Sequence, residues 1–172
     1  MAVEATDIDG LLLVTMKQVQ DERGTVREFY RESAWRTAGL PSLGAFVQIN
    51  LTESSRGVVR GLHGEGMSKL VALAAGEAFG AYVDARPESP SFGAVVTVPL
   101  VAGQQVLVPD GVCNGFQTVS ETSQYLYCFD TEWRPGMAGV AVNPMDAALG
   151  IPWPLPPVLS EKDASAPPLR PH

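Results

Sequence analysis

Residues 57–64, GVVRGLHG, contain His63, the only histidine of the chain apart from His172 near its end. An imidazole with an ordinary pKa of about 6.5 suits a general base at neutral pH. It needs a carboxylate to fix its tautomer. Three aspartates are candidates for this partner: Asp84, Asp146 and Asp163. A single histidine at the end of a strand is also a common hydrogen-bonded structural residue, so spacing alone leaves both roles open.

Two further side chains could complete an acid–base site. Tyr127 lies in the predicted strand SQYLYCFDTEW (123–133) and could carry the opposing acid. Lys69 could stabilise an oxyanion formed between the two groups. Both have ordinary alternatives, because a strand tyrosine is often a core aromatic and a lysine stem often packs along an apolar strand. Three arginines would by themselves be read as solvated surface charges: Arg23, Arg56 and Arg60.

The sequence argues against a metal centre. One usable histidine cannot supply the two or three imidazoles that a barrel site with a carboxylate needs. Cys113 and Cys128 lack metal-ligand spacing, and we interpret them as free thiols of a cytoplasmic protein. We therefore expect chemistry that needs neither a metal nor another cofactor.

Short runs of β-branched and aromatic residues must position these side chains. Six such runs predict strands: 45–51, 69–76, 77–86, 94–100, 104–109 and 123–133. Gly76 and Glu77 separate two runs and predict a tight hairpin. Residues 31–40 predict one or two helical turns. Many short strands at regular spacing predict an all-β sandwich or barrel of the jelly-roll kind, with short peripheral helical turns.

Length and composition restrict the class of protein. The chain has 172 residues, 45% of them hydrophobic and 18% charged, which suits one folded domain over 1–172. From about residue 154 the chain is proline-rich, and we expect it to wrap the surface as irregular chain. A net charge of −7 argues against a nucleic-acid partner. No apolar run approaches the about 20 residues of a membrane span, and no signal peptide is seen.

A set of motifs in a fixed order resembles the nucleotide-sugar 3,5-epimerase family, typified by dTDP-4-dehydrorhamnose 3,5-epimerase. The resemblance covers roughly residues 8–165. The motifs that carry it are DERGTVREF (21–29), VQIN (47–50), GVVRGLH (57–63), KLV (69–71), VDARPESPSFG (83–93), VPDGVCNGF (108–116), SQYLY (123–127), LGIPW (149–153) and LSEKD (159–163). It implies a cupin-like jelly-roll barrel without metal and, normally, a homodimer.

The resemblance also implies a role for each matched residue. His63 falls on the general base, Asp163 on the carboxylate that orients it, and Tyr127 on the acid of the opposite face. Lys69 falls on the lysine near the C-4 carbonyl oxygen. Five further matches imply contacts with the nucleotide, the diphosphate or the sugar: Arg23, Glu28, Gln48, Asn50 and Arg60. In this family the residues matched by Arg23 and Glu28 can come from the partner subunit.

Three features depart from the usual family pattern. Asn114 stands where the family has histidine, and Trp133 stands where many dTDP-sugar enzymes have a tyrosine that stacks on the base. The loop GEGMS (64–68) is shorter than in the rhamnose-pathway enzymes and contains Glu65, which is either a sugar contact or an exposed carboxylate. Together with the HGE start of this loop, the pattern resembles the branch that acts on GDP-linked 4-keto sugars, including heptoses.

The residues and the resemblance together predict an epimerase of a nucleotide-diphosphate-linked 4-keto-6-deoxy sugar. It would remove a proton next to the ketone and return one from the opposite face, without cofactor. The nucleotide, the sugar and the choice of C-3, C-5 or both stay open. One alternative is a non-catalytic nucleotide-sugar binding protein, and a weaker one is a sugar ketoisomerase, which typically carries a histidine pair.

Overall fold

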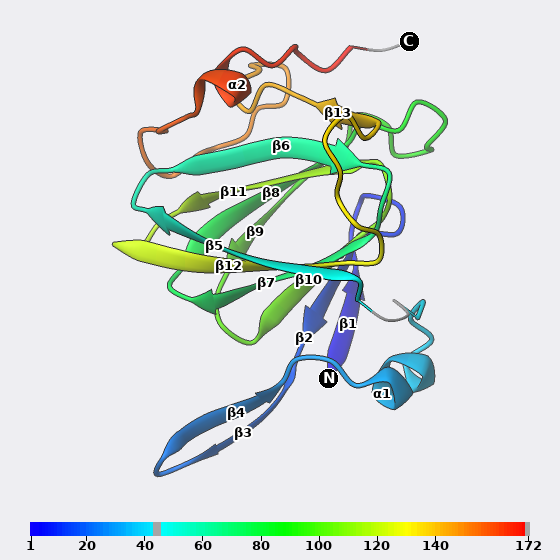
Figure 1. Cartoon of the computed structure of the whole chain (residues 1–172), viewed down its shortest axis with the longest axis vertical. Coiled ribbons are helices and arrows are strands. Elements are labelled where there is room, and N and C mark those ends of the chain that lie inside the picture. The colour runs from blue at the N-terminus through cyan, green and yellow to red at the C-terminus, as the bar shows by residue number, and fades with distance from the viewer. Residues whose placement is uncertain (43–45, 171–172) are drawn as a thin grey trace.

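The computed structural model describes residues 1–42 and 46–170, and its strands form two large sheets that face each other (Figure 1). In the six-stranded sheet the order is β1 (Ala2–Ala5), β2 (Leu12–Thr15), β10 (Gln104–Val108), β7 (Lys69–Ala75), β12 (Thr122–Phe129) and β5 (Gln48–Ser55). In the five-stranded sheet it is β13 (Gly139–Ala141), β6 (Val59–Glu65), β11 (Val112–Thr118), β8 (Ala78–Asp84) and β9 (Val95–Leu100).

A small hairpin and two short helices complete the fold. Strands β3 (Lys17–Asp21) and β4 (Gly24–Glu28) pair only with each other and project away from the two sheets (Figure 1). Helix α1 (Glu32–Thr37) follows them, and helix α2 (Glu161–Ala164) lies beyond β6 near the end of the chain. Within the described chain, no helix has the length and apolar character needed to cross a membrane.

The core has three buried clusters, and two of them lie on opposite faces of the six-stranded sheet. Between the sheets, Phe116 of β11 stacks on Tyr125 of β12, with ring centroids 4.1 Å apart. On the outer face of the six-stranded sheet, Trp35 of α1 belongs to the same buried cluster as Leu70. Since Leu70 packs outward and its neighbour Val71 packs inward, β7 is apolar on both sides.

The expected all-β jelly roll with short helical turns is confirmed. Each of the six predicted strands overlaps an observed one, with Ala45 outside the described residues, and the helix expected in 31–40 is α1. Within residues 1–42 and 46–170, no strand pairing joins the two sheets into a closed barrel. Strands β1 to β4, β6, β11 and β13 lie outside the six apolar runs.

The hairpin predicted at Gly76 and Glu77 is wrong. Strand β7 pairs with β10 and β12, whereas β8 pairs with β9 and β11, so the turn passes from one sheet to the other. Gly76 has a φ of 82° there, and a Cβ at this position would lie 2.4 Å from the Thr122 carbonyl oxygen. A glycine at this position therefore allows the chain to turn tightly from one sheet to the other.

The C-terminal segment wraps the five-stranded sheet mostly as irregular chain, as expected. Gln117 of β11 holds it: its amide nitrogen donates to the Leu155 carbonyl at 2.9 Å, and its amide oxygen accepts from the Leu155 N–H at 3.0 Å. The exception is α2, where the Ser160 side chain accepts from the Asp163 N–H at 3.1 Å and so caps the helix. This cap fixes the place of Asp163.

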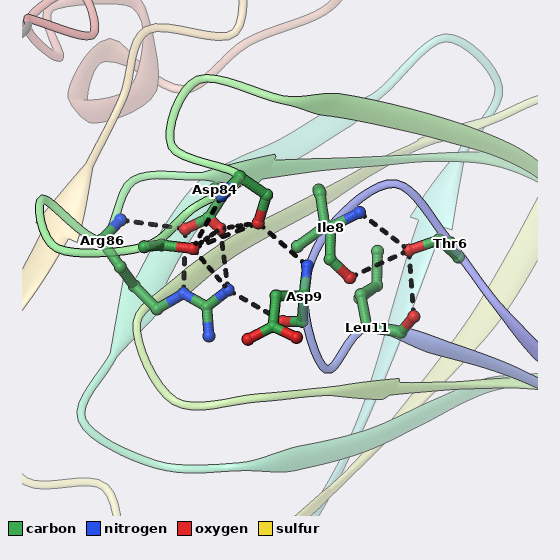
Figure 2. Close-up of polar contacts among 8 residues, drawn as sticks. Thr6, Ile8, Asp9, Leu11, Asp84 and Arg86 are labelled. Carbon is green, nitrogen blue, oxygen red and sulfur yellow. Dashed lines mark hydrogen bonds and ion pairs between the residues drawn. The ribbon is translucent and has the colours of Figure 1, made fainter.

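Asp84 has a structural role that excludes it as the partner of His63. Its buried carboxylate accepts from the Arg86 guanidinium at 2.7 and 2.9 Å and from the Ser89 and Ser91 hydroxyls at 2.6 Å each. Figure 2 shows this cluster beside the turn after β1, where Arg86 donates to the Asp9 carbonyl at 2.8 Å. The cluster therefore ties two turns of opposite sheets together.

Candidate active site

A cavity of about 550 Å³ has walls from both sheets and from α2. Nine of the twelve predicted site residues line it: Asn50, Arg60, His63, Glu65, Lys69, Asn114, Tyr127, Trp133 and Asp163. Three do not: Arg23, Glu28 and Gln48. Residues scattered over more than a hundred positions of sequence are thus gathered around one cavity.

His63 lies near the end of β6 with Asp163 beside it. Its Nε2 atom is 2.8 Å from Asp163 Oδ1, and the Asp163 side chain is only 8% exposed. Asp146, the remaining candidate partner, accepts instead from the Ala148 and Leu169 N–H groups at 3.0 Å each. The pair leaves the other ring nitrogen of His63 for a proton transfer.

Two glycines allow the strands that carry His63 and Asn114 to approach closely. A Cβ at Gly61 of β6 would lie 2.6 Å from the Gly115 Cα of β11. No side chain other than hydrogen fits at that distance. Gly61 in RGLH and Gly115 in NGF therefore allow β6 and β11 to pack closely beneath the site. Asn114 lies opposite His63 in the register of these two strands.

Lys69 is the first residue of β7 and extends into the cavity, almost fully buried. Its ammonium group donates to Asn114 Oδ1 at 2.8 Å and forms an ion pair with Glu65. Since Asn114 cannot titrate, it acts here as a hydrogen-bond acceptor for the lysine. A cation held in a partly closed cavity can stabilise an oxygen that gains negative charge.

Tyr127 enters the cavity from β12, half-buried between aromatic rings. Its ring lies 4.8 Å from that of Tyr125 and 5.9 Å from that of Phe129, measured between centroids. Burial raises the pKa of the Tyr127 hydroxyl, against the opposing effect of the Arg60 charge. The hydroxyl therefore stays protonated at neutral pH and can act as an acid.

Arg60 and Trp133 lie on the exposed side of the cavity. The Arg60 guanidinium donates from Nε to Ser54 Oγ at 2.8 Å and from one terminal nitrogen to the Glu53 carbonyl oxygen at 3.3 Å, and its remaining N–H groups can bind an anion. Trp133 is 48% exposed, and its backbone N–H donates to Gln48 Oε1 at 2.8 Å. The Gln48 amide nitrogen also donates to Asn50 Oδ1 at 3.1 Å, so Gln48 helps to hold two cavity residues, Asn50 and Trp133, in place.

Arg23 and Glu28 lie on the projecting β3–β4 hairpin, outside the cavity of their own chain. Arg23 pairs with Asp21 at 2.5 Å, and Glu28 pairs with Arg31. Both ion pairs are local and exposed, so they do little for stability. This placement leaves their side chains available to another molecule.

The cavity also contains residues that the sequence did not single out. Thr52 follows Asn50 on the same face of β5, and Lys162 precedes Asp163 in the LSEKD motif. The alternation of side chains along the strand could have found Thr52, and its place inside a matched motif could have found Lys162. In the described part of the chain, no group of three or more histidine, cysteine or acidic residues could hold a metal ion.

The chain matches known proteins over almost its whole length. The family profile described as dTDP-4-dehydrorhamnose 3,5-epimerase matches residues 5–171. A dTDP-4-dehydrorhamnose 3,5-epimerase of Salmonella typhimurium is 40% identical over 175 residues, which is 97% of this chain and 94% of the relative. A dTDP-4-dehydrorhamnose 3-epimerase of Streptomyces niveus is 32% identical over 174 residues, 96% of this chain and 83% of the relative.

A solved structure agrees with these matches. The dTDP-6-deoxy-D-glucose-3,5-epimerase of Legionella pneumophila, in complex with dTDP-4-keto-L-rhamnose, superposes with a TM-score of 0.89 at 34% identity. The superposition covers 98% of this chain and 92% of the other. Together with the epimerase motifs and the His63–Asp163 pair, these matches settle the classification: the chain belongs to the dTDP-4-dehydrorhamnose 3,5-epimerase family.

Proposed function

We propose that this protein is an epimerase that inverts C-3, C-5 or both of a dTDP-linked 4-keto-6-deoxy sugar. The observation that carries the proposal is one cavity lined by a histidine–aspartate pair, a buried lysine and a half-buried tyrosine. These are the groups that proton exchange beside a ketone requires. The relatives act on dTDP-linked sugars by name, which favours dTDP over the GDP-linked heptose donor expected from the short loop.

The proposed chemistry follows from the acidity of protons next to a carbonyl group. His63, oriented by Asp163, removes the proton from the carbon beside the C-4 ketone. The resulting enolate oxygen is stabilised by the Lys69 ammonium. Tyr127 then gives a proton to the opposite face of the same carbon. Two separate groups are needed because one group that returned its own proton would regenerate the starting sugar.

Three exposed residues are proposed to bind the diphosphate, the base and the sugar, one residue for each part. Arg60 is suited to the diphosphate, because a guanidinium forms paired hydrogen bonds to phosphate oxygens. Trp133 offers an exposed ring on which a base can stack, and Asn50 offers a donor and an acceptor at the sugar wall. Glu65 is treated below, because its contacts favour another role.

We further propose that the protein works as a homodimer. The β3–β4 hairpin projects with two apolar side chains, Val19 and Val26, which are 61% and 73% exposed and lie opposite each other in register. Ile49 and Leu51 on the edge strand β5 are also more than half exposed. Exposed apolar groups of this kind are typical of subunit contacts. The hairpin of one subunit would then bring Arg23 and Glu28 to its partner's cavity.

A cytoplasmic location stays a prediction.

The test is proton exchange with solvent. The protein is incubated in D₂O with dTDP-linked and, separately, GDP-linked 4-keto-6-deoxy sugars, and the C-3 and C-5 positions are followed by NMR and mass. Deuterium at both carbons establishes a 3,5-epimerase, and deuterium at one carbon a single-centre enzyme. The donor that exchanges faster identifies the nucleotide. Binding of both donors without exchange at either carbon would overturn the proposal in favour of a non-catalytic binding protein.

A further inference from the structure

The Lys69 ammonium group is completely engaged by its own chain. An ammonium has three N–H donors, and the structure provides three acceptors: Asn114 Oδ1 at 2.8 Å, the Glu65 carboxylate, and the His63 carbonyl oxygen at 3.4 Å. The His63 carbonyl is the longest of these contacts. The lysine side chain is only 4% exposed, so water contributes little to its solvation.

A buried ammonium is unfavourable unless a counter-charge compensates for its lost hydration. In the part of the chain that the structure describes, Glu65 is the carboxylate in ion-pair contact with Lys69. The residues paired with Lys69 on the flanking strands, Val108 and Phe129, are apolar. The positive charge of Lys69 therefore depends on Glu65.

The other titratable groups around the lysine do not take this role. The His63 ring is paired with Asp163. Burial raises the pKa of the Cys113 thiol to about 12, so this group stays neutral, and burial likewise keeps the Tyr127 hydroxyl protonated. Asn114, which stands where the family resemblance leads us to expect histidine, is neutral at any pH.

The backbone of Glu65 is fixed in a way that suits a positioning role. Its carbonyl oxygen accepts from the Met67 N–H at 2.8 Å and from the Gly111 N–H at 3.2 Å. Met67, in the middle of the short loop, is 2% exposed. The loop that places Glu65 four residues before Lys69 is thus anchored on both sides, and the carboxylate is presented to the ammonium group.

We propose that Glu65 is a positioning residue of the epimerase, which keeps Lys69 charged and directed at the C-4 oxygen of the sugar. The proposal rests on the proposed function for the identity of that oxygen. On substrate binding, the sugar oxygen replaces the His63 carbonyl as the third acceptor, while Glu65 and Asn114 continue to hold the ammonium. Glu65 therefore acts through Lys69 and not as the sugar contact considered from the sequence.

The lysine content of the chain allows a direct test without substrate. There are three lysines, and Lys17 is exposed and does not line the cavity, so it serves as an internal reference, whereas Lys162 lines the same cavity as Glu65. Lysine labelled with ¹³C at Cε and ¹⁵N at Nζ is observed by NMR in the unaltered chain and in Glu65→Gln. We expect the Lys69 ammonium protons to exchange with water faster in the variant, because a charged acceptor at contact distance has been removed. The Lys17 signal stays the same in both chains.

Kinetic measurements then connect this charge to the reaction. In Glu65→Gln we expect kcat to fall with little change in KM, because Lys69 is held less firmly at the oxygen that gains negative charge in the reaction. Glu65→Asp, which keeps the charge, restores most of kcat, and the matched control Glu77→Gln, an exposed carboxylate outside the cavity, leaves both quantities unchanged. Circular dichroism establishes that the variants are folded.

The outcomes separate this proposal from the function on which it rests. Lys69 ammonium protons that exchange with water at the same rate in both chains overturn the role of Glu65, whatever the activity. If Glu65→Gln does not fold, the proposal is judged on Glu65→Asp, which must keep the slow exchange of the Lys69 protons and most of kcat. Faster exchange of the Lys69 protons in a protein that never exchanges substrate protons would support the contact with Glu65 and contradict the epimerase function instead.

Discussion

Asp163 Oδ1 lies 2.8 Å from His63 Nε2, although the two residues are 100 positions apart in the chain. The contact joins β6 to α2, a helix of four residues whose start is capped by Ser160. Because α2 is so short, its position depends on this cap and on the clamp between Gln117 and Leu155. The orientation of the proposed base is therefore controlled by the C-terminal segment.

Replacing Asp163 by asparagine should lower kcat by about 100-fold, since proton transfer by a correctly oriented base contributes a factor of that order or more. Asparagine has nearly the same volume, so the fold should survive. The rate of epimerisation and the circular dichroism spectrum are the measurements. Asp146→Asn is the matched control, because that carboxylate binds backbone N–H groups away from the cavity. Unchanged kcat in Asp163→Asn would exclude an orienting role.

Tyr127→Phe should separate the two halves of the reaction. Proton removal by His63 remains, so deuterium from D₂O still enters the sugar, but inversion falls by at least about 100-fold because the acid of the opposite face is missing. Tyr125→Phe is the control on the same strand. The Tyr125 hydroxyl is completely buried beside Tyr82, and Tyr125 does not line the cavity, so removal of this hydroxyl should leave inversion intact. Loss of exchange together with inversion in Tyr127→Phe would contradict this division of roles.

The strands predicted best from the sequence are those with apolar residues on both faces and those in which apolar and polar residues clearly alternate. Strand β7 was found almost to its ends, because Leu70 and Val71 pack on opposite faces. Strand β11 was missed because VCNGFQT mixes polar residues and glycine, although all seven residues are buried. Its polar side chains are satisfied by distant partners, Asn114 by Lys69 and Gln117 by Leu155. Partners of this kind cannot be read from local pattern.

The site was predictable in its residue types more than in its geometry. Spacing left three aspartates as partners for His63, and the family resemblance pointed to Asp163 alone. The ion pair of Glu65 with Lys69 spans a loop whose shape depends on the buried side chain of Met67 and on a contact with Gly111. Since both anchors arise from packing, the sequence showed Glu65 only as a carboxylate in a short loop.

Asp84→Asn should destabilise the fold without altering the site. Burial by itself would raise the pKa of Asp84, but the hydrogen bonds from Arg86, Ser89 and Ser91 outweigh it and hold the pKa far below its ordinary value. Removing the charge leaves Arg86 without its partner, which costs about 3 kcal/mol, the lower end for a buried pair, since Arg86 is a quarter exposed. Urea unfolding at pH 7 measures the difference.

The same cluster predicts a pH dependence of stability. Because the folded-state pKa of Asp84 is lowered, its contribution is fully present above the unfolded pKa of about 4 and is lost as the pH falls further below that value. The difference in unfolding free energy between the unaltered chain and Asp84→Asn should therefore shrink between pH 5 and pH 2. A constant difference over this range would show that Asp84 does not stabilise the fold as an ion.

Mixing two inactive variants should restore activity if Arg23 works in the cavity of a partner subunit. His63→Ala lacks the base and Arg23→Ala lacks the hairpin cation, but a mixed dimer contains one cavity with both His63 and Arg23 intact. With random exchange in a two-fold dimer, about half of the dimers are mixed and each has one complete site, so about a quarter of the unaltered activity is expected. The variants are mixed at equal concentration, allowed to exchange, and assayed against each variant alone. Activity no higher than the mean of the two separate variants, in a mixture whose exchange is confirmed by mass, would mean that the hairpin serves its own chain or none.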